Sequence, residues 1–72
     1  MPLFRVTLFI KSRVDDSNRD IEVEAENEQR AAENVAGEKL LERGKPSDYR
    51  AQVMPMPFYG KRMKSFFSQP EI

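Results

Sequence analysis

Residues 15 to 38 concentrate the side chains that could bind a cation or transfer a proton. Asp16, Asn18 and Asp20 stand at alternate positions, as in a calcium-binding loop. However, Ile21 replaces the glycine of such a loop and Asn27 replaces its bidentate glutamate. The spacing therefore predicts a solvated turn and no metal site. The carboxylates of this region are Asp15, Asp16, Asp20, Glu22, Glu24, Glu26, Glu28, Glu33 and Glu38.

Glu22 and Glu24 are the carboxylates whose spacing would suit an acid and base pair. We expect them to lie exposed on one strand face opposite cations, which is unlike the apolar pocket that a general acid needs. The chain has no histidine and no cysteine, which excludes imidazole and thiolate chemistry. It also has no glycine-rich phosphate loop and no G-x-S-x-G turn. We therefore predict that the protein is not an enzyme and has no catalytic residue and no cofactor.

The stretch PMPFYGKRMKSFF, residues 55 to 67, interleaves aromatic rings with cations. In such a pattern cations can contact phosphates while rings stack on bases, which is typical of nucleic-acid binding. A second interpretation is packing, because Met63, Phe66 and Phe67 have helical spacing and could cover a sheet face near Phe9 and Met54. A third is contact with a partner protein. The residues concerned are Phe58, Tyr59, Lys61, Arg62, Lys64, Phe66 and Phe67.

Two predicted strands must position the acidic residues. LFRVTLFIK and RDIEVEA both alternate apolar and polar residues, and SRVDDSN between them is rich in turn formers. We therefore expect an antiparallel hairpin. Its outward rows have opposite charge and favour cross-strand ion pairs, with Arg5 and Lys11 on one strand facing Asp20, Glu22 and Glu24 on the other.

A helix and a third strand should follow the hairpin. Asn27 is a suitable N-cap and Gly44 a suitable C-terminal stop, so the helix is predicted to run between them. Its apolar stripe is Ala31, Ala32, Val35, Ala36 and Leu40. Residues 49 to 54 alternate again and end at a proline. The inward residues of this strand are predicted to be Tyr49, Ala51 and Val53.

The predicted fold class is α+β, of the ββαβ type, with a three-stranded antiparallel sheet in the order 3-1-2 and one helix packed on one face. Residues 1 to 54 form the predicted domain, and residues 55 to 72 a basic and aromatic C-terminal tail. A chain of 72 residues has room for one domain only. The other face of the sheet has no predicted cover, which leaves room for a homodimer.

The charge of the chain is balanced but unevenly distributed. Twelve acidic and twelve basic residues cancel, so the net charge indicates neither nucleic acid nor membrane as a partner. The cations gather in residues 39 to 72, which gives the chain an acidic and a basic half. The absence of cysteine fits a reducing compartment, and MPLFRVTLFIK lacks the apolar core of a signal peptide. We therefore expect a soluble, cytoplasmic protein that does not contact a membrane.

The order of FRVT, IEVEAENEQRAAENVA and YRAQV over residues 3 to 54 resembles two groups of small ββαβ proteins. One group is the phage-encoded inhibitors that bind host RNA polymerase, and the other is the archaeal large-subunit ribosomal protein of similar architecture. The ribosomal protein would be expected to be clearly basic, whereas this chain is neutral with an acidic hairpin. The resemblance to the inhibitors implies an acidic strand face that contacts a basic surface of a host enzyme.

The sequence therefore predicts a small, non-enzymatic protein–protein interaction module, of the kind encoded by phages or mobile elements, that modulates a host protein. The alternative is a nucleic-acid-associated accessory protein that binds through the C-terminal tail. The predicted partner-binding residues are Asp20, Glu22, Glu24, Phe58, Tyr59, Lys61, Arg62, Lys64, Phe66 and Phe67.

Overall fold

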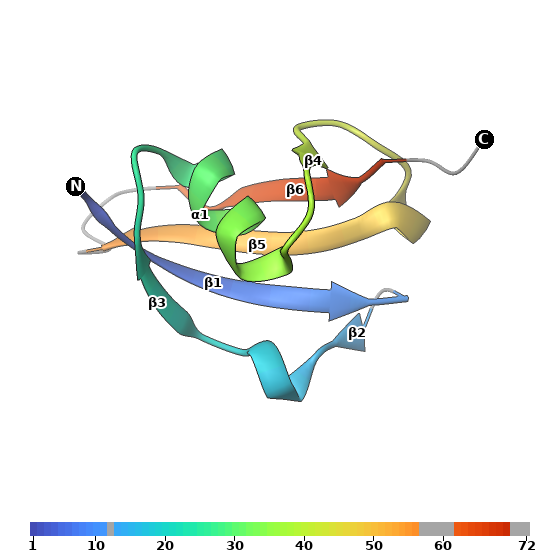
Figure 1. The fold of residues 1–72 in the computed structure, drawn as a ribbon. Helices are drawn as coiled ribbons and strands as arrows, with labels where there is room; N and C mark the ends of the chain where they lie inside the picture. Colours follow the sequence, from blue (N-terminus) through green and yellow to red (C-terminus); the bar gives the residue numbers. More distant parts are fainter. Residues whose placement is uncertain (12, 57–61, 70–72) are drawn as a thin grey trace.

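In the described part of the chain, a sheet of six strands has one α-helix against it (Figure 1). A computed structural model describes residues 1–11, 13–56 and 62–69. The strands follow the order β2-β1-β5-β6-β4, while β3 pairs with β1, and all pairings are antiparallel. In chain order the elements are β1 (Leu3–Ile10), β2 (Arg13–Val14), the 3-10 turn η1 (Asp16–Asn18), β3 (Ile21–Glu24), α1 (Glu28–Ala36), β4 (Leu40–Leu41), the 3-10 turn η2 (Pro46–Asp48), β5 (Tyr49–Met56) and β6 (Lys64–Ser68).

The predicted α+β class, with one helix and an antiparallel sheet, is confirmed. The three predicted strands also have the predicted order, because β1 lies between β3 and β5. The prediction that the sheet has only three strands is wrong. The short strands β2 and β4 and the longer β6 extend it.

The segment Lys64–Ser68 forms β6, although we predicted it as part of a tail that could fold as one helical turn. β6 pairs with β5 on one side and with β4 on the other. Phe66 is 1% exposed and lies in the core, whereas Ser65 and Phe67 on either side of it are only partly buried. This alternation is that of a strand. Two adjacent phenylalanines obscured it in the sequence.

The helix begins where predicted and ends earlier than predicted. The side chain of the N-cap Asn27 accepts a hydrogen bond from the N–H of Arg30 at 2.9 Å. At the other end Gly37 adopts a left-handed conformation with φ 73°, and its N–H bonds the carbonyl of Glu33. A glycine in this conformation stops a helix. The predicted extension to Gly44 is therefore wrong, and the chain after Gly37 is free to form β4.

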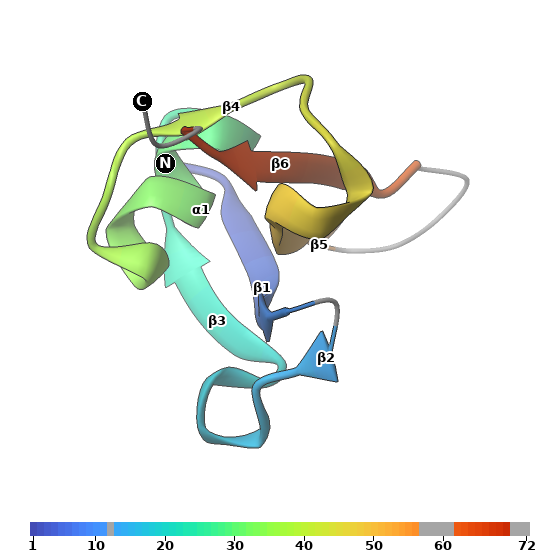
Figure 2. The same cartoon turned by 90° about the vertical axis from the view of Figure 1, so that its right-hand side faces the viewer.

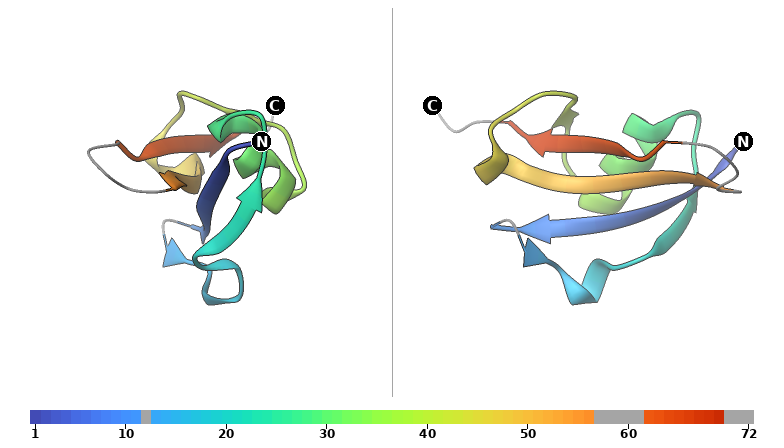
Figure 3. Two further views of the ribbon diagram at one scale, coloured as in Figure 1. Left: turned by 90° about the vertical axis from the view of Figure 1, so that its left-hand side faces the viewer. Right: turned by 180° about the vertical axis from the view of Figure 1, so that it is seen from behind.

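α1 lies against one face of the sheet (Figures 2 and 3). The buried side chains of the helix and of the strands form one cluster. Ala31 and Ala32 are fully buried, and such small residues let the helix lie close to the strands. The core consists of Phe4, Val6, Leu8, Ala25, Ala31, Ala32, Leu40, Ala51, Val53 and Phe66. No described helix is long and apolar enough to cross a membrane. The helix thus covers one face of the sheet, and none of the described residues forms an α-helix over the other face, which we call the open face.

Candidate functional site

β3 carries two of the predicted partner-binding residues, Glu22 and Glu24, both of them exposed. Arg5 lies directly opposite Glu22, and its Nη2 is 3.4 Å from Glu22 Oε1. These side chains are 34% and 53% exposed, so the ion pair is largely solvated. Glu24 lies opposite Leu3 and forms no ion pair with any described residue. Its carboxylate is therefore available to a partner.

The predicted pairing of Lys11 with the acidic row does not occur. Lys11 follows the end of β1, where its φ of 49° places it in a turn toward β2. β2 pairs with the end of β1, so β3 reaches only as far as Val6. Among the described residues, Arg5 is thus the cation that faces the acidic row from the neighbouring strand, while Arg19 approaches Asp20 from within the turn.

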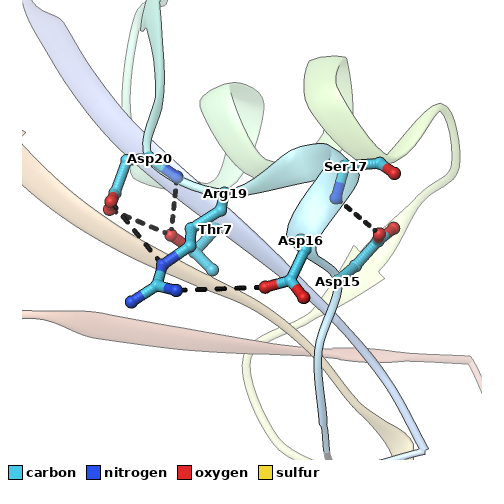
Figure 4. A network of polar contacts seen from close by, with 6 residues as sticks. All are labelled: Thr7, Asp15, Asp16, Ser17, Arg19 and Asp20. Atoms are coloured by element: carbon cyan, nitrogen blue, oxygen red, sulfur yellow. Dashed lines mark hydrogen bonds and ion pairs between the residues drawn. The ribbon is translucent and has the colours of Figure 1, made fainter.

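Asp20 is held in position by contacts with β1 and with its own turn (Figure 4). Its φ of 51° is uncommon for a residue with a side chain. The N–H of Asp20 donates to Thr7 Oγ1 at 3.0 Å, and the Thr7 hydroxyl lies 3.4 Å from Asp20 Oδ1. Arg19 Nε is 3.9 Å from the Asp20 carboxylate. Asp20 therefore lies just before the start of β3 and fixes the direction in which the turn enters the strand.

The remaining carboxylates of this turn are used within it. Asp15 accepts hydrogen bonds from the N–H of Ser17 at 3.1 Å and from Asn18 Nδ2 at 2.8 Å. Asp16 lies 3.9 Å from Arg19 Nη1. No group of carboxylates suited to holding a metal ion occurs in residues 1–11, 13–56 and 62–69. The local chemistry is that of a capped turn.

The open face of the sheet adjoins the acidic residues and holds a shallow pocket of about 120 Å³. Met63, just before β6, is 47% exposed and accepts a hydrogen bond from Gln52 Nε2. The pocket combines charged, hydroxyl, amide and thioether groups from four segments of the chain. Its lining residues are Arg5, Thr7, Asp20, Gln52, Met54 and Met63.

Three aromatic rings form a second feature of the sheet surface. Tyr49 packs edge-to-face against Phe9 at 4.7 Å and against Phe67 at 5.5 Å between ring centroids. The Tyr49 hydroxyl lies 3.0 Å from Ser65 Oγ. The prediction that Tyr49 points inward with Ala51 is not met, because the register shifts between these two residues, as at a β-bulge.

The predicted binding residues near the C-terminus have separate surroundings. Arg62 is exposed, whereas Lys64 Nζ lies 3.7 Å from the Glu28 carboxylate at the start of α1. Phe66 is in the core, and Phe67 packs on Tyr49. Three further residues lie outside the described part of the chain, namely Phe58, Tyr59 and Lys61. The described rings and cations are therefore engaged mainly with the protein itself.

The structure thus brings Asp20, Glu22 and Glu24 to one margin of the sheet and adds neighbours that sequence reasoning did not select. Thr7 and Gln52 lie opposite each other on β1 and β5, next to the pocket. The alternation of β1 and β5 placed both residues on the outward face. The packing interpretation expected Met63 near Met54, and Met63 does line this pocket with Met54, but it comes from just before a strand and not from a helical turn.

The chain was also compared with known proteins. No family model, no curated protein and no solved structure matches it. The basis for a functional assignment is therefore the chemistry of the described surface.

Proposed function

We propose that this chain is a non-enzymatic protein-interaction module that binds a basic surface of a partner protein through β3 and the adjoining open face. The observation that carries the proposal is the exposed carboxylate pair of Glu22 and Glu24, only one of which has a described cation beside it. A basic partner would gain an electrostatic contact with Glu24 without first breaking an internal ion pair.

The surroundings of the acidic pair also suit a protein partner. Met63 is 47% exposed, and Met54 and Tyr49 are partly exposed on β5. Methionine, aromatic and arginine side chains are enriched in protein interfaces, and Arg5 stands between the methionines and the carboxylates. The flexible methionine side chains can adapt to an apolar part of a partner, and the carboxylates of β3 lie beside them.

The nucleic-acid alternative has weaker support from the described residues. Phe66 is buried and Phe67 packs on Tyr49, so stacking of either ring on a base would require β6 to leave the sheet. Lys64 is next to Glu28, and the exposed carboxylates of β3 would repel a phosphate backbone. Arg62 alone provides little affinity for phosphate.

As to its biological setting, we propose a cytoplasmic phage or mobile-element protein that modulates a host enzyme. The resemblance of residues 3 to 54 to phage-encoded inhibitors of host RNA polymerase supports this choice. An acidic strand face of that kind suits a basic surface on a large enzyme.

The test is capture from a bacterial lysate, followed by a direct binding measurement with the purified captured protein. Glu24→Lys should weaken binding, because it replaces an attractive charge with a repulsive one. Glu42→Lys makes the same change in charge at another exposed position and should leave binding intact. Equal binding by wild type, Glu24→Lys and Glu42→Lys would contradict the proposal.

A second copy of the chain is the competing occupant of the open face. Sedimentation of the wild-type protein alone, over a range of concentrations, separates the two occupants. A concentration-dependent dimer that blocks capture of any partner would overturn the proposal in favour of self-association.

A further inference from the structure

β3 offers unpaired main-chain groups at the margin of the sheet, beyond the carboxylates already described. The N–H of Ala25 donates to the carbonyl of Pro2 at 3.1 Å, in register with the β1–β3 pairing. Alternate residues of an antiparallel strand bond the same neighbour, so Val23 and Ile21 also direct their main-chain groups toward β1. The N–H and C=O groups of Glu22 and Glu24 must therefore point away from β1.

Nothing in the described sheet pairs with that outer side of β3. β3 has β1 as its neighbour and lies off the path of the other strands, at the lower margin of the sheet in Figure 1. An edge of this kind is a template for an added strand. The left-handed Asp20, whose N–H is bonded to Thr7, limits the available edge at one end.

The two faces of β3 specify which residues an added strand would carry. Glu22 and Glu24 point to the open face, whereas Val23 packs against the core and Ile21 is partly exposed beside it. Side chains of an added strand would alternate in the same way. Residues opposite the two glutamates would be basic, and the residue opposite Val23 would be apolar.

The same charges make a second copy of β3 a poor occupant. Pairing two β3 edges would bring Glu22 and Glu24 of one copy beside the same residues of the other. Like charges directly opposite each other on neighbouring strands are destabilising. The charges of this edge therefore disfavour pairing with a second copy of β3 and favour pairing with a basic segment.

We infer that β3 binds an extended segment of the partner as an additional strand, and that this segment alternates basic and apolar residues. The inference rests on the proposed function and specifies the partner chemistry and binding mode at the same surface. Main-chain hydrogen bonds to Glu22 and Glu24 hold the segment, and their carboxylates select its charge.

Synthetic peptides test this binding mode directly. The probe is a fluorescein-labelled peptide that alternates lysine and valine, and its control has the same composition with all lysines before all valines. Two further versions are N-methylated, one on the lysine amides and the other on the valine amides. When the peptide pairs antiparallel to β3, as every described strand pairs with its neighbour, and places its lysines opposite the glutamates, only methylation of the lysine amides blocks the bonds to β3.

Fluorescence anisotropy with the full chain should show binding of the alternating peptide. N-methylation of the lysine amides should weaken that binding at least about tenfold, the loss expected when two main-chain hydrogen bonds are removed. N-methylation of the valine amides should change it by less than about threefold. The peptide with grouped lysines should bind more weakly than the alternating one.

Variants of the protein separate charge from main-chain bonding. Glu24→Gln removes the carboxylate and keeps the outward N–H, whereas Glu24→Pro removes both. Proline is tolerated at this edge position because the lost N–H does not pair with β1. Binding should fall in the order wild type, Glu24→Gln, Glu24→Pro, with amide spectra confirming that each variant is folded.

Two results would overturn the inference. One is equal binding of the two N-methylated peptides, which would indicate attraction by charge without an added strand. The other is no binding of the alternating peptide by the wild-type chain. Neither result bears on the proposed function, which fails if a captured protein binds Glu24→Lys as tightly as wild type or if self-association blocks the capture of any partner.

Discussion

Phe66 and Phe67 are neighbours in the sequence with different roles. Phe66 is fully buried among residues of α1 and the central strands, whereas Phe67 packs on Tyr49 at the sheet surface. Phe66→Ala should cost about 3–5 kcal/mol of stability, as for other large core residues. A domain of this size has only about 3–5 kcal/mol in total, so this variant should be largely unfolded.

Phe67→Ala is the matched control and should leave the chain folded with a smaller loss of stability. Urea unfolding followed by far-ultraviolet circular dichroism checks both variants. Equal stability of Phe66→Ala and wild type would show that β6 does not contribute to the core.

Thr7 supports the backbone of Asp20 through its hydroxyl. Thr7→Val keeps the shape of the side chain but leaves the Asp20 N–H without this acceptor. The loss should be about 1 kcal/mol, whereas Thr7→Ser, which keeps the hydroxyl, should lose less. Chemical denaturation of both variants provides the comparison, and equal losses would mean that the hydrogen bond contributes nothing.

The start of α1 depends on a single side-chain cap. Asn27→Ala should lower the free energy of unfolding by about 1 kcal/mol, because the N–H of Arg30 loses its acceptor. Asn34→Ala, at an exposed position within the same helix, is the control and should change stability little or raise it. Thermal unfolding of the pair checks the prediction, which a larger loss in Asn34→Ala would contradict.

β6 completes the core and pairs with the outer side of β5. A chain ending at Met54 lacks Phe66 and exposes the unpaired edge of β5. It should show no cooperative unfolding transition, whereas the full chain should show one. A cooperative transition in the shortened chain, measured by circular dichroism on heating, would favour the predicted separation of a domain from a tail.

The elements differ in how well their sequences predicted them. β1, β3 and β5 have clear alternation, so their order and the pairing of Arg5 with Glu22 could be inferred. β4 has only two residues, Leu40–Leu41, and is held in part by the helix, since Gln29 Nε2 donates to the Leu40 carbonyl and Glu33 accepts from the Leu40 N–H. Such tertiary contacts have no local sequence signal.

Only the part of the candidate site that depends on strand alternation could be predicted from the sequence. The exposure of Glu22 and Glu24 follows from the alternation of their strand. The contact between Gln52 and Met63 depends on β6, and the position of Tyr49 depends on a register shift between β5 and β6. These features arise from pairing between distant segments, which the period of one segment does not specify.

The net charge of the whole molecule is zero, but its acidic and basic residues lie in different parts of the fold. Carboxylates gather at β3, while Arg62 and Lys64 lie at the opposite side of the sheet with β6. Partner binding through β3 should therefore weaken about tenfold when salt rises from about 0.05 M to about 0.5 M. Isothermal titration at the two salt concentrations checks this, and an affinity independent of salt would contradict an electrostatic contact.

Amide hydrogen exchange of β3 tests most directly whether this strand binds the partner. NMR would monitor the exchange with and without the alternating lysine and valine peptide. The outward N–H groups of Glu22 and Glu24 should exchange more slowly when the peptide is bound, because they become hydrogen-bonded. The N–H of Val23, which already faces β1, should change less. Binding of the peptide with no added protection at Glu22 and Glu24 would contradict the central claim that β3 is the binding strand.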